Sequence, residues 1–196
     1  RLRLDLPEEK LPLLESLGIE QLVLIPFDKT LSKLSANNFL KDVLFNQLQT
    51  KSISVGENFR FGYKRQGDIN TIKESISNHN IAFNIVPLLE DQNGRISSSR
   101  VRELLLNCDL DNARELLQRP YTFTGKVVKG KGLGKKIGFP TANLEIDGRK
   151  FLPGEGVYAA WTFAEESKVK IRSLMNLGPQ PTIDPLSPSA VEVHLI

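Results

Sequence analysis

The feature that most constrains the fold is a change of pattern near Arg119-Pro120 in the 196-residue chain. Before this point, short apolar runs alternate with amphipathic segments, a pattern that predicts a parallel sheet covered by helices. After it, short β-rich runs are separated by Gly/Pro clusters, as in a small antiparallel barrel or sandwich. We therefore predict an α/β domain over residues 1–118 and an all-β domain over residues 119–196.

The expected elements follow from apolar spacing and from helix caps. The predicted strands of the first domain lie at Leu22–Ile25, Ile53–Gly56 and Ile81–Val86. Its predicted helices begin at Ser35, near Asn70 and at Ser97–Ser99, and a short one follows through Leu116 and Leu117. The helix after Ser35 should bury one face made of Phe39, Leu40, Val43, Leu44 and Leu48. The predicted strand runs of the second domain are Tyr121–Val128, Gly156–Phe163, Ile171–Asn176 and Val191–Leu195.

Composition excludes several classes of protein. The chain is 40% hydrophobic and 25% charged, which is typical of a soluble globular protein. No stretch reaches the roughly 18–20 consecutive apolar residues that a membrane span needs. The single cysteine, Cys108, excludes an intrachain disulfide and favours a reducing cytoplasm; we expect it to be a small apolar residue on a helix. The chain opens without methionine and closes in a strand pattern, so both ends are expected to be incomplete.

The most chemically suggestive stretch is rich in glycine and lysine. Five lysines and no acid lie between Lys126 and Lys136, which fits either a solvated hairpin or a polyanion site. The run Gly130–Asn143 is neither a Walker A loop nor a dinucleotide fingerprint, but closely spaced glycines let backbone amides approach an anion. Thr141 and Asn143 would share one face of a strand, where their oxygens suit Mg²⁺ and phosphates. From these residues alone, an ordinary surface loop is equally compatible.

The same stretch closely resembles the opening strands of riboflavin kinases. The resemblance rests on Gly125–Gly130 and Gly138–Asn143, and later segments agree in the same order. It implies that Thr141 and Asn143 organise Mg²⁺ and the ATP phosphates, and that Glu192 is the catalytic glutamate. It also implies ATP-phosphate contacts from the loop residues Gly130, Gly132, Gly134 and Lys136. Without the resemblance, a glutamate between two valines on a strand would be interpreted as a solvated surface residue.

The first half resembles the partner domain of bacterial FAD synthetases. Val55–Gly62 is similar to that family's flavin-side loop, which implies flavin contacts from Asn58, Phe59 and Arg60. Ile96–Arg102 is similar to the Ile-Ser-Ser-Thr-x-x-Arg motif of nucleotidyltransferases, which implies an ATP site at a helix N-terminus. The residues implied there are Ser97, Ser98, Ser99 and Arg102. From the residues alone, a helix cap, a turn and a core aromatic explain the same positions.

One departure concerns histidine. The family's His-x-Gly-His motif belongs near the N-terminus, whereas this chain has only His79 and His194, neither in that context. His79 is expected at the surface, and His194 could simply face the side of its strand opposite its apolar neighbours.

The resemblance implies two reactions and a Rossmann-like domain followed by a riboflavin-kinase barrel. Riboflavin would be phosphorylated by ATP to FMN, and FMN would be adenylylated by a second ATP to FAD with release of pyrophosphate. The implied ligands are ATP, Mg²⁺, riboflavin, FMN and FAD, with no nucleic acid or membrane partner, and no oligomeric state follows. Two alternatives remain at this stage. One is a flavin- or nucleotide-binding protein without catalysis, and the other is a basic nucleic-acid-binding module, although Lys126–Lys136 lacks the aromatic residues that stack on bases.

Overall fold

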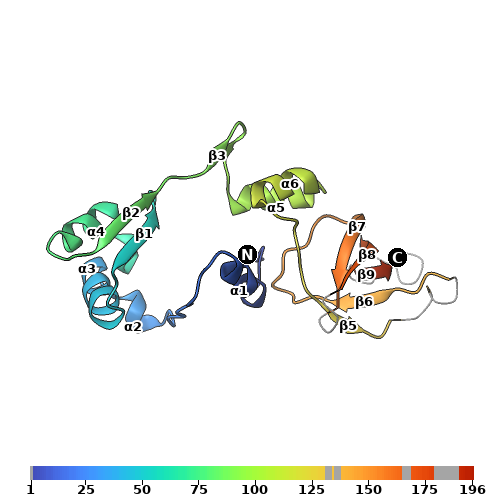
Figure 1. Cartoon of the computed structure of the whole chain (residues 1–196), viewed down its shortest axis with the longest axis horizontal. Helices are drawn as coiled ribbons and strands as arrows, with labels where there is room; N and C mark the ends of the chain where they lie inside the picture. Colours follow the sequence, from blue (N-terminus) through green and yellow to red (C-terminus); the bar gives the residue numbers. More distant parts are fainter. Residues whose placement is uncertain (1, 131–133, 135–137, 165–168, 179–189) are drawn as a thin grey trace. The chain divides into compact units, whose positions relative to one another are not determined.

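The computed structural model describes residues 2–130, 134, 138–164, 169–178 and 190–196. The chain divides into two compact units, one formed by Gln21–Ile96 and the other by Arg1–Glu20 together with Ser97–Ile196 (Figure 1). The second unit thus combines the two ends of the chain. Each unit is described by itself below.

The unit 21–96 is built on two parallel strands. β1 (Ser52–Gly56) pairs with β2 (Ala82–Val86), and the connection between them contains the short helix η2 (Tyr63–Arg65) and α4 (Ile69–Ile76). Asp68 begins α4 by accepting the backbone N–H groups of residues 70 and 71, as an N-cap should. The core of the unit is the buried cluster Ala36, Leu40, Ile53, Phe61 and Ile72. The predicted parallel strand–helix–strand arrangement is confirmed for these elements.

The helix predicted after Ser35 is present, but its turns are wider than expected. α2 (Lys29–Ser32) comes first, and the Ser35 hydroxyl then caps α3 (Ala36–Asn38), which continues into the π-helical η1 (Phe39–Gln47). In η1 the Leu48 N–H bonds to the Val43 carbonyl, five residues back, as in a π-helix. A wider turn shifts the side chains around the axis. Leu40 and Val43 are buried as predicted, whereas Leu48 is exposed.

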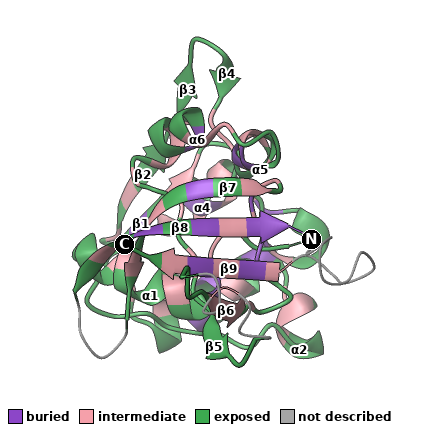
Figure 2. Cartoon of the chain, turned by 90° about the vertical axis from the view of Figure 1, so that its right-hand side faces the viewer, coloured by how far each residue is buried: buried purple, intermediate pink, exposed green. Residues whose placement is uncertain are grey.

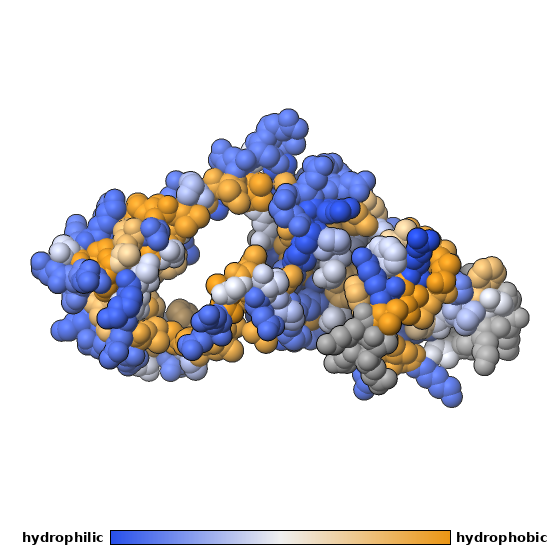
Figure 3. Space-filling view, in the orientation of Figure 1, coloured by the Kyte–Doolittle hydropathy of each residue, from blue (hydrophilic) through white to orange (hydrophobic). Residues whose placement is uncertain are grey.

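The strand predicted at Leu22–Ile25 is wrong. These residues form no strand and all four are exposed, with Leu24 at 82%. Hydrophobic side chains are exposed on the surface along the segment that precedes α2 (Figure 3). The physical reason is pairing: a strand needs a neighbour for its backbone groups, and the β1–β2 ladder does not extend to these residues. The unit also contains a small antiparallel hairpin, β3 (Glu90–Asp91) with β4 (Gly94–Arg95).

The second unit carries three helices, α1 (Pro7–Ser16), α5 (Ser98–Leu106) and α6 (Leu110–Leu117). α5 and α6 bury Val101, Leu105 and Ala113 against Phe151, which comes from the loop before β7. The prediction that Cys108 lies on a helix is wrong. It lies in the turn between α5 and α6 at φ 59°, exposed, with its Sγ 3.2 Å from the Tyr158 hydroxyl. The turn must reverse the chain there, which ends the helix two residues earlier.

The rest of this unit is a five-stranded antiparallel sheet in the order β5-β6-β9-β8-β7. Its strands are β5 (Lys126–Val128), β6 (Ala142–Glu145), β7 (Gly156–Phe163), β8 (Lys170–Gly178) and β9 (Ala190–Leu195). The inner face contributes the buried cluster Tyr158, Met175, Leu177, Val191 and Val193. Buried and more exposed residues alternate along β8 and β9 (Figure 2). An antiparallel sheet is confirmed. Among the described strands β5 and β7 are its two edges.

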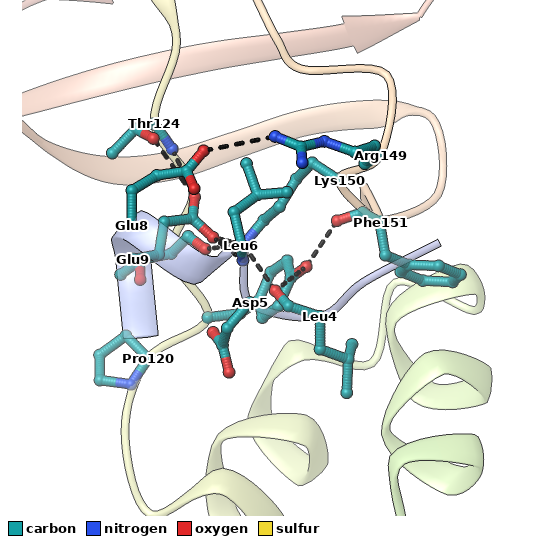
Figure 4. A network of polar contacts seen from close by, with 12 residues as sticks. Leu4, Asp5, Leu6, Glu8, Glu9, Pro120, Thr124, Arg149, Lys150 and Phe151 are labelled. Atoms are coloured by element: carbon teal, nitrogen blue, oxygen red, sulfur yellow. Dashed lines mark hydrogen bonds and ion pairs between the residues drawn. The ribbon is translucent and has the colours of Figure 1, made fainter. Parts of the chain in front are cut away.

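A polar network ties the N-terminal segment to this unit (Figure 4). The Lys150 ammonium donates to Glu9 Oε2 at 2.6 Å, to the Leu4 carbonyl at 2.6 Å and to the Thr122 carbonyl at 2.7 Å. Its side chain is 0% exposed and that of Glu9 is 7% exposed. Burial opposes ionisation of Glu9, but hydrogen bonds from Lys150 and from the Leu6 N–H, with the charge of Lys150, hold the pKa of Glu9 below its ordinary value. A buried, fully bonded ion pair therefore fastens α1 to Lys150 and to the segment before β5.

Candidate functional site

A row of polar side chains crosses the outer face of the sheet. In the register, Glu192 on β9 lies opposite Asn143 on β6 and opposite Asn176 on β8. Its neighbours Val191 and Val193 are buried on the inner face, so Glu192 faces the other side. Directly opposed residues have Cβ atoms about 4.5–5.5 Å apart, so Glu192 lies between two asparagines. Asn143 and Glu192, which were predicted to share a site, are brought together.

Thr141 and the glycine-rich segment border this row. Thr141 comes immediately before β6, two residues from Asn143, and so belongs to the same face. A Cβ on Gly130 would overlap the Asn143 amide, and a Cβ on Gly134 would overlap the Phe139 carbonyl. Glycine therefore allows the backbone to lie directly against the Asn143 side chain at position 130 and against the Phe139 carbonyl, just before β6, at position 134. Gly132 and Lys136, also predicted here, lie outside the described residues.

Two residues on this face, Asn176 and His194, are absent from the site predicted from the sequence. Asn176 lies between buried Met175 and Leu177, and His194 follows buried Val193, but such alternation alone does not separate a site residue from a solvated one. The sheet register shows that Asn176 neighbours Glu192, and a side-chain hydrogen bond shows that His194 neighbours Pro140. Both depend on residues far apart in the chain.

The donor atoms on this face are of one chemical kind. The Thr141 hydroxyl, the Asn143 amide and the Glu192 carboxylate are hard oxygen donors, which Mg²⁺ prefers. Mg²⁺ commonly keeps several waters and is held by one or two carboxylates together with substrate phosphates. These residues fit a cation that arrives with a nucleotide. When bound, such a cation would neutralise charge on the phosphates.

The N-terminus of α5 is the second place where predicted residues gather. The Ser97 hydroxyl accepts the Arg100 N–H at 3.3 Å and so caps the helix. Ser98 and Ser99 form the first turn, where the helix dipole favours an anion. The predicted cap is confirmed; whether it binds ATP stays a prediction.

Arg102 lies one turn further along α5 and is held in place by this unit. Its Nη1 donates to the Ser98 carbonyl at 2.9 Å and its Nη2 to the Leu2 carbonyl at 3.0 Å. The guanidinium lies 5.8 Å from the centre of the Phe151 ring. Its Nε is buried and has no hydrogen-bond partner within the described part of the chain. Arg102 is thus oriented by its own helix, by Leu2 near the N-terminus and by the loop that carries Phe151.

The residues predicted on the flavin side belong to the unit 21–96. Phe59 is 39% exposed and stacks on Phe61, with the ring centres 5.5 Å apart. Arg60 Nη1 lies 2.9 Å from Asp68 Oδ2, the cap of α4. Asn58 follows β1 in the turn where the Phe59 N–H bonds to the Gly56 carbonyl. The half-exposed ring of Phe59 is compatible with a stacking surface, and its flavin contact stays a prediction.

Two known families match separate parts of the chain. The sequence model of the FAD synthetase family matches residues 1–100, and that of the riboflavin kinase family matches residues 117–196. The chain belongs to the FAD synthetase family. The first match contains the flavin-side loop and reaches into the Ser97 segment, and the second contains Thr141, Asn143 and Glu192.

Relatives of this FAD synthetase family member are similar along nearly all of it. The bifunctional riboflavin kinase/FMN adenylyltransferase of Buchnera aphidicola subsp. Schizaphis graminum is 36% identical over 98% of the chain and 62% of its own length. The protein of the same name from Escherichia coli K12 is 34% identical over 99% of the chain and 61% of its own length. The chain therefore spans about three fifths of the length of these curated relatives.

A solved structure shares the fold of the FAD synthetase family member. It is named a macrolide-efflux protein from Streptococcus pneumoniae, superposes with a TM-score of 0.85 and is 29% identical, covering 100% of this chain and 62% of its own. Within the residues described, no helix is both long and apolar enough to cross a membrane.

Proposed function

We propose that the protein makes FAD from riboflavin in two ATP-dependent steps, in line with the two activities, riboflavin kinase and FMN adenylyltransferase, that its relatives are named for. A kinase domain over residues 119–196 forms FMN, and an adenylyltransferase domain over residues 1–118 converts FMN to FAD. The two family matches, which end at residue 100 and begin at residue 117, support this division. In fold, the first domain is Rossmann-like and the second a riboflavin-kinase barrel. Both act in the cytoplasm.

The observation that carries the kinase proposal is the row of Asn143, Glu192 and Asn176 beside Thr141. Glu192 accepts the proton of the riboflavin 5′-hydroxyl as that oxygen forms a bond to the γ-phosphorus of ATP and ADP departs. Thr141 and Asn143 would hold Mg²⁺ and the phosphates, and the closely spaced glycines would let backbone amides approach the phosphates. General base and metal-binding oxygens must flank one acceptor, and the neighbouring positions of these residues on one face support the proposal.

The adenylyltransferase proposal rests on the N-terminus of α5. The capped first turn, Ser97–Ser99, receives the ATP phosphates, and Arg102 supplies a fixed positive charge one turn further. A phosphate oxygen of FMN attacks the α-phosphorus and pyrophosphate leaves. Asn58, Phe59 and Arg60 contact the flavin. The step needs positioning and charge neutralisation rather than a protein nucleophile.

Two labels separate these reactions in one assay. The full-length protein is incubated with riboflavin and Mg²⁺, once with ATP labelled at the γ-phosphate and once with ATP labelled at the α-phosphate. We expect label from the γ-labelled ATP in FMN and, once that FMN is adenylylated, also in FAD, and label from the α-labelled ATP in FAD only. Tight flavin and ATP binding in titration calorimetry without transfer of either label would instead support a binding protein without catalysis.

A further inference from the structure

His194 contacts the backbone that leads into Thr141. It lies two residues after Glu192 on β9 and therefore on the same outer face of the sheet. Its Nδ1 is 2.7 Å from the Pro140 carbonyl oxygen, and its ring lies edge-on to Phe139 with the centres 5.6 Å apart. A carbonyl can only accept, so Nδ1 carries the proton and donates it. One side chain thus holds the two residues before Thr141.

Backbone pairing does not hold this segment. The β6–β9 ladder begins at the pair Ala142 and Val193, one step short of Thr141. Pro140 has no N–H to donate to a ladder. The Phe139 N–H is bonded to the Gly134 carbonyl at 2.9 Å, which turns it toward the glycine-rich loop and away from β9. The hydrogen bond to Pro140 and the ring contact with Phe139, both made by the His194 side chain, therefore link this segment directly to β9.

We propose that His194 is a positioning residue for phosphoryl transfer. By holding the Pro140 carbonyl and the Phe139 ring, it sets the Thr141 hydroxyl beside Asn143 and Glu192, so that the metal-binding and proton-accepting groups keep one spacing. This inference rests on the proposed kinase function. Outer partners that orient the groups around a metal typically contribute about 10–100-fold in affinity or activity.

Replacing His194 by asparagine or by glutamine tests whether the hydrogen bond to Pro140 matters or whether any polar side chain suffices. In His194→Asn, the amide nitrogen is attached to Cγ, as Nδ1 is in histidine, so it can still donate to the Pro140 carbonyl. In His194→Gln, the amide is one carbon further out and misses that position. His194→Phe keeps the ring contact with Phe139 and removes the donor. His79→Phe is the matched control, because this exposed histidine also contacts a phenylalanine ring, that of Phe45 at 4.7 Å, in the other unit.

The full-length variants are assayed for riboflavin phosphorylation at varied Mg-ATP and riboflavin, and for FMN adenylylation. We expect His194→Gln and His194→Phe to lower kinase kcat/KM for Mg-ATP by about 10–100-fold. The KM for riboflavin and the adenylylation rate should stay unchanged, and His194→Asn should recover most of the loss. Equal activity of the asparagine and glutamine variants, or a normal phenylalanine variant, would overturn the inference. If the unsubstituted protein does not phosphorylate riboflavin, the proposed function fails instead.

Discussion

Replacing Lys150 by methionine tests the buried ion pair at the base of the sheet. The substitution keeps the length and apolar stem of the side chain but removes the ammonium that three acceptors share. The carboxylate of Glu9 is then left buried without its counter-charge, beside the Thr122 carbonyl that has lost the same donor, whereas the Leu4 carbonyl keeps the Tyr121 hydroxyl. Removing one partner of a buried ion pair typically costs about 3–5 kcal/mol, because the remaining charge loses its compensation. We expect a loss of that size in the free energy of unfolding of this unit.

The neighbouring Arg149 provides the matched control. Its guanidinium lies 2.6 Å from Asp147 and 3.7 Å from Glu8, but its side chain is 59% exposed. Exposed ion pairs contribute little to stability, so Arg149→Met should leave the free energy of unfolding nearly unchanged. Urea unfolding followed by tryptophan fluorescence reports on this unit alone, because the single tryptophan, Trp161, lies on β7. Equal losses in the Lys150 and Arg149 variants would refute the reasoning.

The Glu9–Lys150 ion pair makes the stability of this unit depend on pH. The pKa of Glu9 is lowered in the folded protein, so the folded state binds this proton less well than the unfolded state. The pair therefore stabilises the unit fully above the ordinary glutamate pKa, about 4.3, and the contribution is lost as pH falls through the lowered value. In Glu9→Gln this part of the acid dependence should disappear. An unchanged acid-unfolding curve would contradict the assignment.

Three predictions concern the proposed sites. Arg102→Ala should remove about 1.5–3 kcal/mol of ATP-phosphate stabilisation in FMN adenylylation, the scale of a charge-assisted hydrogen bond, and should leave riboflavin phosphorylation unchanged. Equal loss of both activities would make Arg102 structural. Thr141→Val keeps the shape and removes the hydroxyl, so kinase activity should collapse while FMN-to-FAD conversion survives, and normal kinase turnover with normal Mg²⁺ dependence would make it a packing residue. Glu192→Gln should lower kinase kcat by about 10²–10⁴-fold with ATP affinity retained, and near-normal turnover would exclude a general base.

Local signals predicted several elements correctly. The run that ends at Gly56 and the one that Pro87 stops became the two parallel strands, and Ser35 and Ser97 became caps. The strand predicted at Leu22–Ile25 shows the limit of such signals. An apolar run specifies a strand only if another strand is beside it, and that is a non-local condition.

Part of the candidate kinase site could be predicted from the sequence, and part could not. The motif around Thr141 and Asn143 is visible in the sequence, and its likeness to riboflavin kinases singled out Glu192. The positions of Asn176 and His194 depend on the register of β8 and β9, which only the folded sheet reveals. The pairing of Glu9 with Lys150 spans 141 positions, and no local pattern indicates it.

That separation has a consequence for how the protein is made. A ribosome adds about 5–20 residues per second, so Lys150 is synthesised about 7–28 s after Glu9. Residues 21–96, whose compact unit uses neighbouring sequence, emerge during that interval and can fold first. Meanwhile the segment around Leu6, which is 2% exposed in the finished protein, has no sheet to cover it. The segment around Leu6 thus reaches its final place only after Lys150 has been made, and until then its apolar side chains are exposed to chaperones and proteases.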